Sequence, residues 1–370
     1  MAFLILEIAA RALHLGTGGF WQPDPYVGWR NIPQAQGWES CFGECEIYVE
    51  INSQGLRDRE IGYQAEPGQR RILFLGDSTT AGMQVTLEQS YVKQLEQALN
   101  RNSSGNWVTI NAAVNGYGTD NELLFYRQEA SQYEAELVIV GVYLANDVYN
   151  NSRELDARTG GSRFKPYFEL DEAGQLILQN YPVEGLEAPS VRFSTFLKRY
   201  FQLPRFVAQV LSLRTQGQTL LSSNQATPTP APAGSPPPSP TNESRLNICS
   251  SQYAPKLVYA WDVTKALLGQ LKEEVEAHGQ QLAVLIIPAQ PQTVVPAGDD
   301  PWYCDRPNQE LTAFLESEQI PYLDPLPAFR DYVQAGGPAL YFERDFHNTA
   351  AGHQLLAESL YPFVLELLNE

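Results

Sequence analysis

The 370-residue sequence predicts an α/β fold of three layers, with a central parallel sheet and a large insertion. Short apolar runs alternate with longer stretches of helical periodicity, which is typical of a parallel sheet covered by helices on both faces. Hydrophobic residues make up 43% of the chain and aromatic residues 11%, so it can bury a large core. A long stretch without this alternation follows the third apolar run and indicates the insertion.

The expected elements follow one another in strand and helix order. The expected strands are Arg71–Leu75, Trp107–Asn111, Leu137–Tyr143, Gln281–Ile287 and Pro321–Leu323. The expected helices are Glu88–Asn100, Thr119–Ser131, Ala254–His278, Asn308–Glu318 and Ala350–Leu368. We therefore assign residues 65–370 to one domain that carries an insertion at 148–253.

Two segments precede the first strand. Residues 17–64 are rich in turn residues and are expected to form a turn- and β-rich extension. The stretch "MAFLILEIAARALHLG", residues 1–16, is apolar but interrupted by Glu7 and Arg11, and it is shorter than the roughly 20 residues of a membrane span. Two interpretations stay open: the tail of a signal anchor that begins upstream, or an amphipathic helix packed on the domain.

The insertion contains three recognisable patterns. "KPYFELDEAGQLILQ" predicts a β-hairpin that turns at residues 171–174. "RFSTFLKRYFQLPRFVAQVL" predicts an aromatic amphipathic helix. Residues 226–244 are so rich in proline that an extended loop or spacer is expected there.

Charge and cysteine content narrow the classes of partner and site. A formal charge of -18 would repel a phosphate backbone or an anionic membrane surface, so nucleic acid is not an expected partner. The four cysteines come from scattered segments that would make an odd zinc site, and we interpret them as two disulfides, Cys41 with Cys45 and Cys249 with Cys304. Free buried thiols remain the alternative, because pairing cannot be deduced from sequence. Disulfides would place the protein outside the cytoplasm.

The stretch "RILFLGDSTTAG" raises the question of function, because its apolar run stops at Gly76 and small polar residues follow. In an open parallel sheet the ligand site lies outside the carboxyl ends of the strands, which is where Ser78 is expected. A serine there can act as a nucleophile while its own N–H faces a developing oxyanion. The alternative is that Asp77, Ser78 and Thr79 only cap the next helix.

The next two strands also end in polar residues, "NAAVNGYGTDNE" and "YLANDVYNN". Gly116 can bring a backbone N–H close to a substrate, and Asn146 offers a side-chain amide, so both could complete an oxyanion hole with Ser78. Taken singly, these residues could equally be a turn glycine and an Asx turn.

A serine nucleophile needs a base, and the chain has four histidines. His14 lies in the apolar N-terminal segment, and His278 lies in the last turn of a helix, where the helix dipole accounts for it. His353 is expected to be a packing or capping residue. His347 lies just before the last helix with Asp345 two positions earlier, and a carboxylate there can hold the imidazole ring.

In order and context these blocks resemble the SGNH or GDSL-type hydrolases, over residues 71–150 and 280–370. The resemblance implies a flavodoxin-like three-layer fold, with Ser78 as nucleophile, Gly116 and Asn146 in the oxyanion hole and His347 as base. The segments "VGWRN" and "INSQGLRDRE" are similar to stretches that precede the hydrolase domain in some bacterial members.

The sequence departs from the family pattern at two positions. The common Asp three residues before the His is replaced by Arg344, which cannot orient an imidazole. The spacing of Asp345 and His347 instead resembles the D-x-H block of alginate O-acetyltransferases and related polysaccharide acetylation enzymes. The second departure is Ala145, where many members have Gly before the Asn.

The sequence therefore predicts a serine acyl-ester hydrolase or O-acyltransferase without a cofactor or metal ion. The resemblance implies acetylated carbohydrate as the substrate, with lipid esters and small aryl esters as the alternatives. Asp345 is the expected partner of His347, with Glu343 as the competing candidate. A non-catalytic carbohydrate-binding or scaffold protein is the alternative function. A nucleotide binder is disfavoured because "GDSTTAG" has neither G-x-G-x-x-G nor a P-loop lysine.

Overall fold

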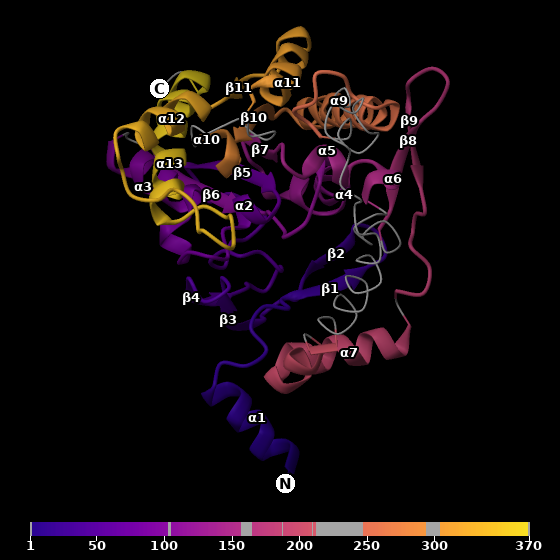
Figure 1. Ribbon diagram of the computed structural model, residues 1–370, viewed down its shortest axis with the longest axis vertical. Helices are drawn as coiled ribbons and strands as arrows, with labels where there is room; N and C mark the ends of the chain where they lie inside the picture. The colour runs from indigo at the N-terminus through magenta and orange to yellow at the C-terminus, as the bar shows by residue number, and fades with distance from the viewer. Residues whose placement is uncertain are drawn as a thin grey trace, which may run out of the picture.

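The computed structural model describes residues 2–102, 105–156, 165–186, 188–208, 210–211, 247–293 and 304–368. The Pro-rich stretch 226–244 lies outside these residues. Figure 1 shows a layered α/β body, with the N-terminal helix at the opposite end of the molecule from α9 and α11.

Five parallel strands form the central sheet. They are β5 (Gln69–Gly76), β6 (Asn106–Asn111), β7 (Leu137–Tyr143), β10 (Gln281–Ile287) and β11 (Tyr322–Leu323). Their spatial order is β11-β10-β7-β5-β6. Numbered by appearance in the chain, this is the flavodoxin-like order 2-1-3-4-5. The predicted fold class is confirmed, and all five predicted strands are present.

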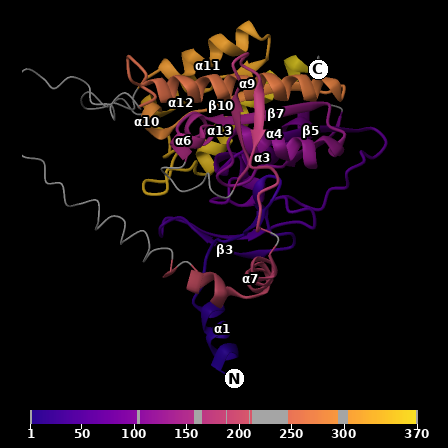
Figure 2. The ribbon, with the colours of Figure 1, turned by 90° about the vertical axis from the view of Figure 1, so that its right-hand side faces the viewer.

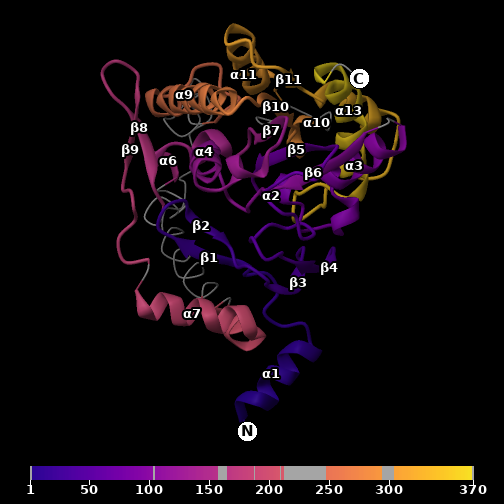
Figure 3. The same cartoon turned by 180° about the vertical axis from the view of Figure 1, so that it is seen from behind.

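Helices cover both faces of this sheet (Figures 1 and 3). One face packs on α3 (Tyr91–Asn102), α12 (Leu326–Gln334) and α13 (Ala350–Leu367). The other packs on α4 (Thr119–Gln128), α9 (Pro255–Ala277) and α11 (Arg306–Ser317). Along β5, Phe74 faces the first set and Leu75 the second. Because both faces are buried, the strands read as continuous apolar runs rather than as alternating ones. The sequence did not predict α12.

The N-terminal extension consists of two antiparallel hairpins. The first pairs β1 (Trp21–Asp24) with β2 (Gly28–Asn31), and the second pairs β3 (Gln36–Ser40) with β4 (Glu46–Glu50). A disulfide between Cys41 and Cys45 closes the turn of the second hairpin, with the Cα atoms 4.9 Å apart. The hairpins share a small apolar core with the sheet domain, which contains Phe20, Ile32, Val49, Ile51, Ala81, Met83 and Ala113. The extension therefore packs against the segments that follow β5 and β6.

The insertion begins with α5 (Asp147–Asn150) and α6 (Arg153–Asp156). The predicted hairpin is present as β8 (Tyr167–Leu170) and β9 (Leu176–Gln179). Next comes α7 (Pro189–Tyr200), which lies between the β1–β4 hairpins and α1 (Ala2–Ala12) in the side view of Figure 2. The short helices are α2 (Ser78–Ala81), α10 (Gln290–Thr293) and the 3₁₀ turns η1 (Leu87–Gln89) and η2 (Ala130–Tyr133).

The predicted single helix over residues 192–211 is wrong, because α7 ends at Tyr200 and a new helix begins after Phe201. Pro204 lacks the N–H that would bond to the carbonyl of Tyr200 in a continuous helix. That carbonyl accepts a hydrogen bond from Arg11 at 2.8 Å instead. The carboxylate of Glu7 caps the new helix by accepting two of its first backbone N–H groups, at 3.0 and 2.9 Å.

Candidate active site

Ser78 lies at the first position of α2, directly after β5. Asp77 is the N-cap, and its Oδ1 accepts the N–H of Thr79 at 2.8 Å. Gly76 is required before them, because a Cβ at this residue would lie 2.3 Å from Oγ1 of Thr80. The sharp turn from strand to helix therefore exposes the hydroxyl of Ser78 at the carboxyl edge of the sheet. The expected helix cap is present, but Asp77 provides it and not Ser78.

Hydrogen bonds link Ser78, His347 and Asp345 in sequence. His347 Nε2 is 2.8 Å from Ser78 Oγ, and His347 Nδ1 is 2.5 Å from Asp345 Oδ1. The imidazole ring and the Asp345 carboxylate are largely buried. No hydrogen bond or ion pair to His347 from the exposed side chain of Glu343 is among the contacts of the described residues. The structure thus brings together the three side chains that the sequence singled out.

The conformation of the loop 342–347 allows Asp345 to reach His347, although only one residue separates them. Phe342 N–H bonds to the carbonyl of His347 at 2.9 Å, and Tyr341 pairs with Asn348 in a β-bridge, so the loop is a closed hairpin. Phe346 has a φ of 65°, in the left-handed region that costs a bulky residue energy. This turn lets residues two positions apart point their side chains toward each other.

Gly116 reaches the same edge because the chain after β6 continues to run beside β5. Ala112 N–H bonds to the carbonyl of Phe74 at 2.9 Å, and Val114 N–H bonds to that of Gly76 at 3.1 Å. Residues 115–116 therefore follow next to Asp77 and Ser78. Gly116 has a φ of 79°, which glycine adopts without strain.

Asn146 follows β7 and is fixed by Asp77. Its Nδ2 donates to Asp77 Oδ2 at 2.9 Å, whereas its Oδ1 is buried without a partner among the described contacts. A side-chain amide has two N–H donors, so one remains for a substrate oxygen. Asp77 thus has two structural roles, since one of its oxygens caps α2 and the other orients Asn146.

The electrostatics of the site centre on His347. Burial alone would lower the pKa of His347, but the hydrogen bond and charge of Asp345, together with the charge of Asp77, raise it above its ordinary value. Glu39, from β3, has a pKa raised to about 7 by burial and by the charge of Asp345. Glu39, a carboxyl group from the extension, therefore interacts electrostatically with both Asp345 and His347.

Two more carboxyl groups lie beneath the site. Burial, and then the charge of Asp77, raises the pKa values of Glu122 and Asp147 well above their ordinary values. Lys165 is buried nearby but pairs with Asp120, at 2.8 Å. The protonated forms of Glu122 and Asp147 are therefore favoured.

The remaining histidines have other partners. His353 is buried, its Nδ1 accepts the N–H of Tyr91 at 3.3 Å, and burial followed by the charge of Arg57 lowers its pKa to about 3. His278 bonds to a carbonyl of its own helix. His14 pairs with Glu46 at 2.6 Å.

The extension contributes contacts that the sequence did not reveal. The carboxylate of Glu44, in the loop closed by the first disulfide, accepts the backbone N–H groups of three consecutive residues, Glu343, Arg344 and Asp345, at 2.8, 2.8 and 3.2 Å. Trp29 Nε1 donates to the carbonyl of Asn115 at 2.9 Å. The extension thus holds the loop of His347 and the loop of Gly116.

A mostly apolar cavity of about 290 Å³ adjoins these groups. Its wall includes Ala145, the neighbour of Asn146, and Phe346, the neighbour of His347. The other lining residues are Tyr143, Leu144, Ile248, Cys249, Ala289, Gln290, Pro291, Gln292 and Pro307. The cavity therefore borders the chain neighbours of Asn146 and His347, although neither of these two residues nor Ser78 lines it.

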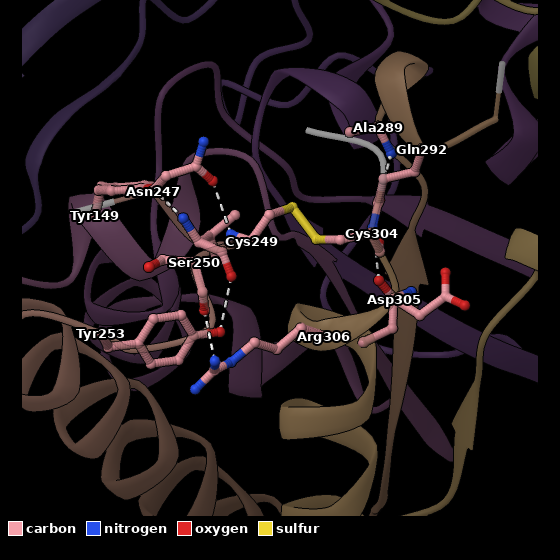
Figure 4. Close-up of a disulfide and its surroundings, with 12 residues drawn as sticks. Tyr149, Asn247, Cys249, Ser250, Tyr253, Ala289, Gln292, Cys304, Asp305 and Arg306 are labelled. Atoms are coloured by element: carbon pink, nitrogen blue, oxygen red, sulfur yellow. Dashed lines mark hydrogen bonds between the residues drawn. A yellow bond between two sulfur atoms is a disulfide. The ribbon is translucent and has the colours of Figure 1, made fainter. Parts of the chain in front are cut away.

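Cys249, one of these lining residues, belongs to the second disulfide, which Figure 4 shows with its surroundings. Cys249 and Cys304 are bonded with their Cα atoms 5.7 Å apart, so the end of the insertion is joined to the start of α11. Arg306 reinforces the junction by donating to the carbonyl of Ser250 at 2.5 Å and stacking on the ring of Tyr253. Among the described residues, no group of three or more His, Cys, Asp or Glu could hold a metal ion.

The sequence matches no protein-family model and no curated protein. In structure the chain is similar to the acetyl xylan esterase AlAXEase, at 9% identity and a TM-score of 0.44, over 80% of this chain and 99% of that one. It is also similar to a catalytic mutant of the acetylxylan esterase Axe2 from Geobacillus stearothermophilus, at 13% identity and a TM-score of 0.43, over 80% and 94%. TesA gives 12% identity and a TM-score of 0.40, over 80% and 99%. At these sequence identities and TM-scores, the similarity does not indicate the substrate of this chain.

Proposed function

We propose that the chain is a serine acyl-ester hydrolase or O-acyltransferase in which Ser78, His347 and Asp345 act as a triad. The observation that carries the proposal is the hydrogen-bonded series from Ser78 Oγ through His347 to Asp345. A nucleophile within hydrogen-bond reach of a base, which a third group orients, is the arrangement that acyl transfer requires.

In the proposed reaction, His347 Nε2 takes the proton of Ser78 while Oγ attacks the ester carbonyl carbon. The backbone N–H groups of Ser78 and Gly116 and one N–H of Asn146 stabilise the resulting oxyanion. His347 then gives its proton to the leaving alcohol, which leaves an acyl-enzyme. Water or an acceptor hydroxyl attacks this ester and gives its proton to His347. His347 then returns the proton to Ser78 Oγ as the bond between Oγ and the acyl carbon breaks, which releases the acid or the new ester.

Acetylated carbohydrate is the substrate class that we propose. Its support is the resemblance of the Asp345 to His347 spacing to polysaccharide O-acetyltransferases, and the same resemblance supports transfer to a sugar hydroxyl. The apolar cavity beside Asn146 and His347 would accept the acyl group.

The decisive experiment separates three outcomes. The protein is incubated with an acetyl donor with and without candidate glycans, and both free acetate and acetylated glycan are followed. Acetate alone identifies a hydrolase, and acetylated glycan identifies a transferase. If neither forms and a fluorophosphonate probe does not label Ser78, the chain is a binding or scaffold protein.

We also propose that the protein works outside the cytoplasm, because two disulfides are expected to persist only in an oxidising compartment. Mass spectrometry of unreduced digests, on protein recovered from its native compartment, should find Cys41 joined to Cys45 and Cys249 joined to Cys304. Four free thiols would contradict this location.

A further inference from the structure

Exposed apolar side chains are concentrated on two segments at one end of the molecule. Among the described residues, 21 large hydrophobic side chains are exposed, and 11 of them fall in residues 3–13 and 193–211. They are Phe3, Leu4, Ile5, Leu6, Ile8 and Leu13 on and after α1, and Phe193, Phe196, Tyr200, Val207 and Leu211 on and after α7. We call this set the apolar end. Single exposed hydrophobic residues need no explanation, but a cluster of this size does.

The two segments form one surface. The rings of Phe3 and Phe201 meet edge to face with their centres 5.3 Å apart, and those of Phe196 and Tyr200 are 5.1 Å apart. Phe193, Phe196 and Tyr200 are spaced three and four residues apart, which places them on one side of α7. Figures 1 and 2 show α1 and α7 together, with the β1–β4 hairpins between them and the sheet.

The helix α1 has a fixed position on the protein and yet leaves most of its apolar surface exposed. Only Glu7 and Ala10 of its 11 residues are buried. Glu7 caps the helix after α7 and pairs with Arg11 at 2.7 Å, so the polar side of α1 faces the protein. None of the helices in the described ranges combines the length and the apolar character needed to cross a membrane. The apolar side of α1 faces away from the protein.

The charge at the apolar end is opposite in sign to that of the whole chain. Residues 188–211 contain four basic residues, Arg192, Lys198, Arg199 and Arg205, and no acidic residue, whereas the chain has a formal charge of -18. Arg205 is buried, but Arg192 is exposed, as is most of the side chain of Arg11. Apolar side chains next to cations, within an otherwise acidic protein, fit an anionic lipid surface better than another copy of the chain.

We propose that the apolar end is a membrane-docking face. Its aliphatic and aromatic side chains enter the boundary between headgroups and acyl chains, while Arg192 and Arg199 contact anionic headgroups. This face belongs to α1 and to the insertion, so it is separate from the site around Ser78. Docking would hold the candidate active site on the side of the hairpins away from the bilayer.

The test is flotation of the 370-residue chain with vesicles of phosphatidylcholine, with and without phosphatidylglycerol. The wild-type chain should float with the anionic vesicles and should be released by salt. Substituting Phe193→Ser and Phe196→Ser together should reduce binding at least about tenfold. Arg192→Gln and Arg199→Gln should each reduce binding to anionic vesicles about fivefold and leave binding to neutral vesicles unchanged.

A matched control removes two exposed apolar residues elsewhere, Ile177→Ser on β9 and Val258→Ser on α9, and should bind like the wild type. Near-ultraviolet circular dichroism and thermal unfolding verify that every variant is folded. Absence of vesicle binding by the wild type, or an equal loss in the control, would overturn the proposal. A dimer that the Phe193 and Phe196 substitutions dissociate, seen by sedimentation velocity, would identify a second copy as the occupant and also overturn it.

Discussion

The carboxylate of Glu44 accepts the backbone N–H of Arg344 at 2.8 Å, although the two residues are 300 positions apart. The backbone N–H groups of Glu343 and Asp345 bond to the same carboxylate. Desolvation alone would raise the pKa of Glu44, but these three hydrogen bonds and the charge of Arg344 lower it. The loop of Glu44 is itself closed by the disulfide between Cys41 and Cys45. The N-terminal extension thus sets the position of the loop that carries Asp345 and His347.

The first prediction tests this positioning role. Glu44→Ala should lower kcat about tenfold to a hundredfold with little change in KM, because a small displacement of His347 is costly when the substrate still binds. Glu46→Gln is the control, since Glu46 lies on the same hairpin but pairs with His14. The pH at which His347 titrates in the rate profile should stay the same in both variants. A loss caused by unfolding alone would instead appear as a lower unfolding temperature and a smaller folded fraction by circular dichroism, because unfolding removes active enzyme without changing KM.

The second prediction concerns the proposed nucleophile and base. Ser78→Ala and His347→Ala should each lower turnover about a thousandfold or more, because members of a triad act as a unit. His278→Ala is the control and should keep full activity, because His278 bonds to its own helix, touches the ring of Tyr126 and has no contact with Ser78 or His347 among the described residues. Circular dichroism should show the same fold in all three. Activity near that of the wild type in either of the first two variants would refute the assignment.

The third prediction separates Asp345 from Glu343 by pH dependence. The base must be neutral, so kcat/KM should rise with pH through the pKa of His347, which lies above its ordinary value. Asp345→Asn removes the charge that supports this shift, so the rise should move to lower pH while the maximum falls about a hundredfold to ten-thousandfold. Glu343→Gln should change neither the pH at which kcat/KM rises nor its maximum. If Glu343→Gln shifts the profile and Asp345→Asn does not, Asp345 is not the residue that orients His347.

The fourth prediction concerns stability and Glu39. Its pKa is about 7 in the folded protein against 4.5 for an ordinary Glu. Between these values the folded state binds more protons than the unfolded state, so this group makes the free energy of unfolding decrease as pH rises. Glu39→Gln removes that decrease. The unfolding temperature of the variant, relative to wild type, should therefore be higher above pH 7 than near pH 4.5. Glu50→Gln, an exposed position on the same hairpin, should show no such trend.

The sequence was sufficient to predict the strands of the sheet and to identify the residues around Ser78, because both depend on local patterns. Strands buried on two faces give continuous apolar runs, and the rule that ligands bind at the carboxyl ends of strands directs attention to Ser78, Gly116 and Asn146. Their catalytic roles remain predictions. The contacts of Glu44 and Trp29 could not be predicted, because they join segments that are far apart in the chain and have no shared periodicity. The break at Phe201 has a local signal in Pro204, which the prediction of one continuous helix did not use, whereas the cap from Glu7 joins distant segments and could not be predicted.

The last prediction concerns the acyl group. The cavity beside Asn146 and His347 measures about 290 Å³, so an acetyl group would fill only a small part of it. Hexanoyl esters of 4-nitrophenol should therefore be turned over at least as well as acetyl esters. Ala289→Leu adds bulk to the cavity wall and should lower kcat/KM for the hexanoyl ester about tenfold relative to the acetyl ester. Ala98→Leu makes the same change in a groove formed by α3 and α13 and should leave the ratio unchanged. If the wild type prefers acetyl esters and Ala289→Leu does not alter the ratio, the acyl group does not occupy this cavity.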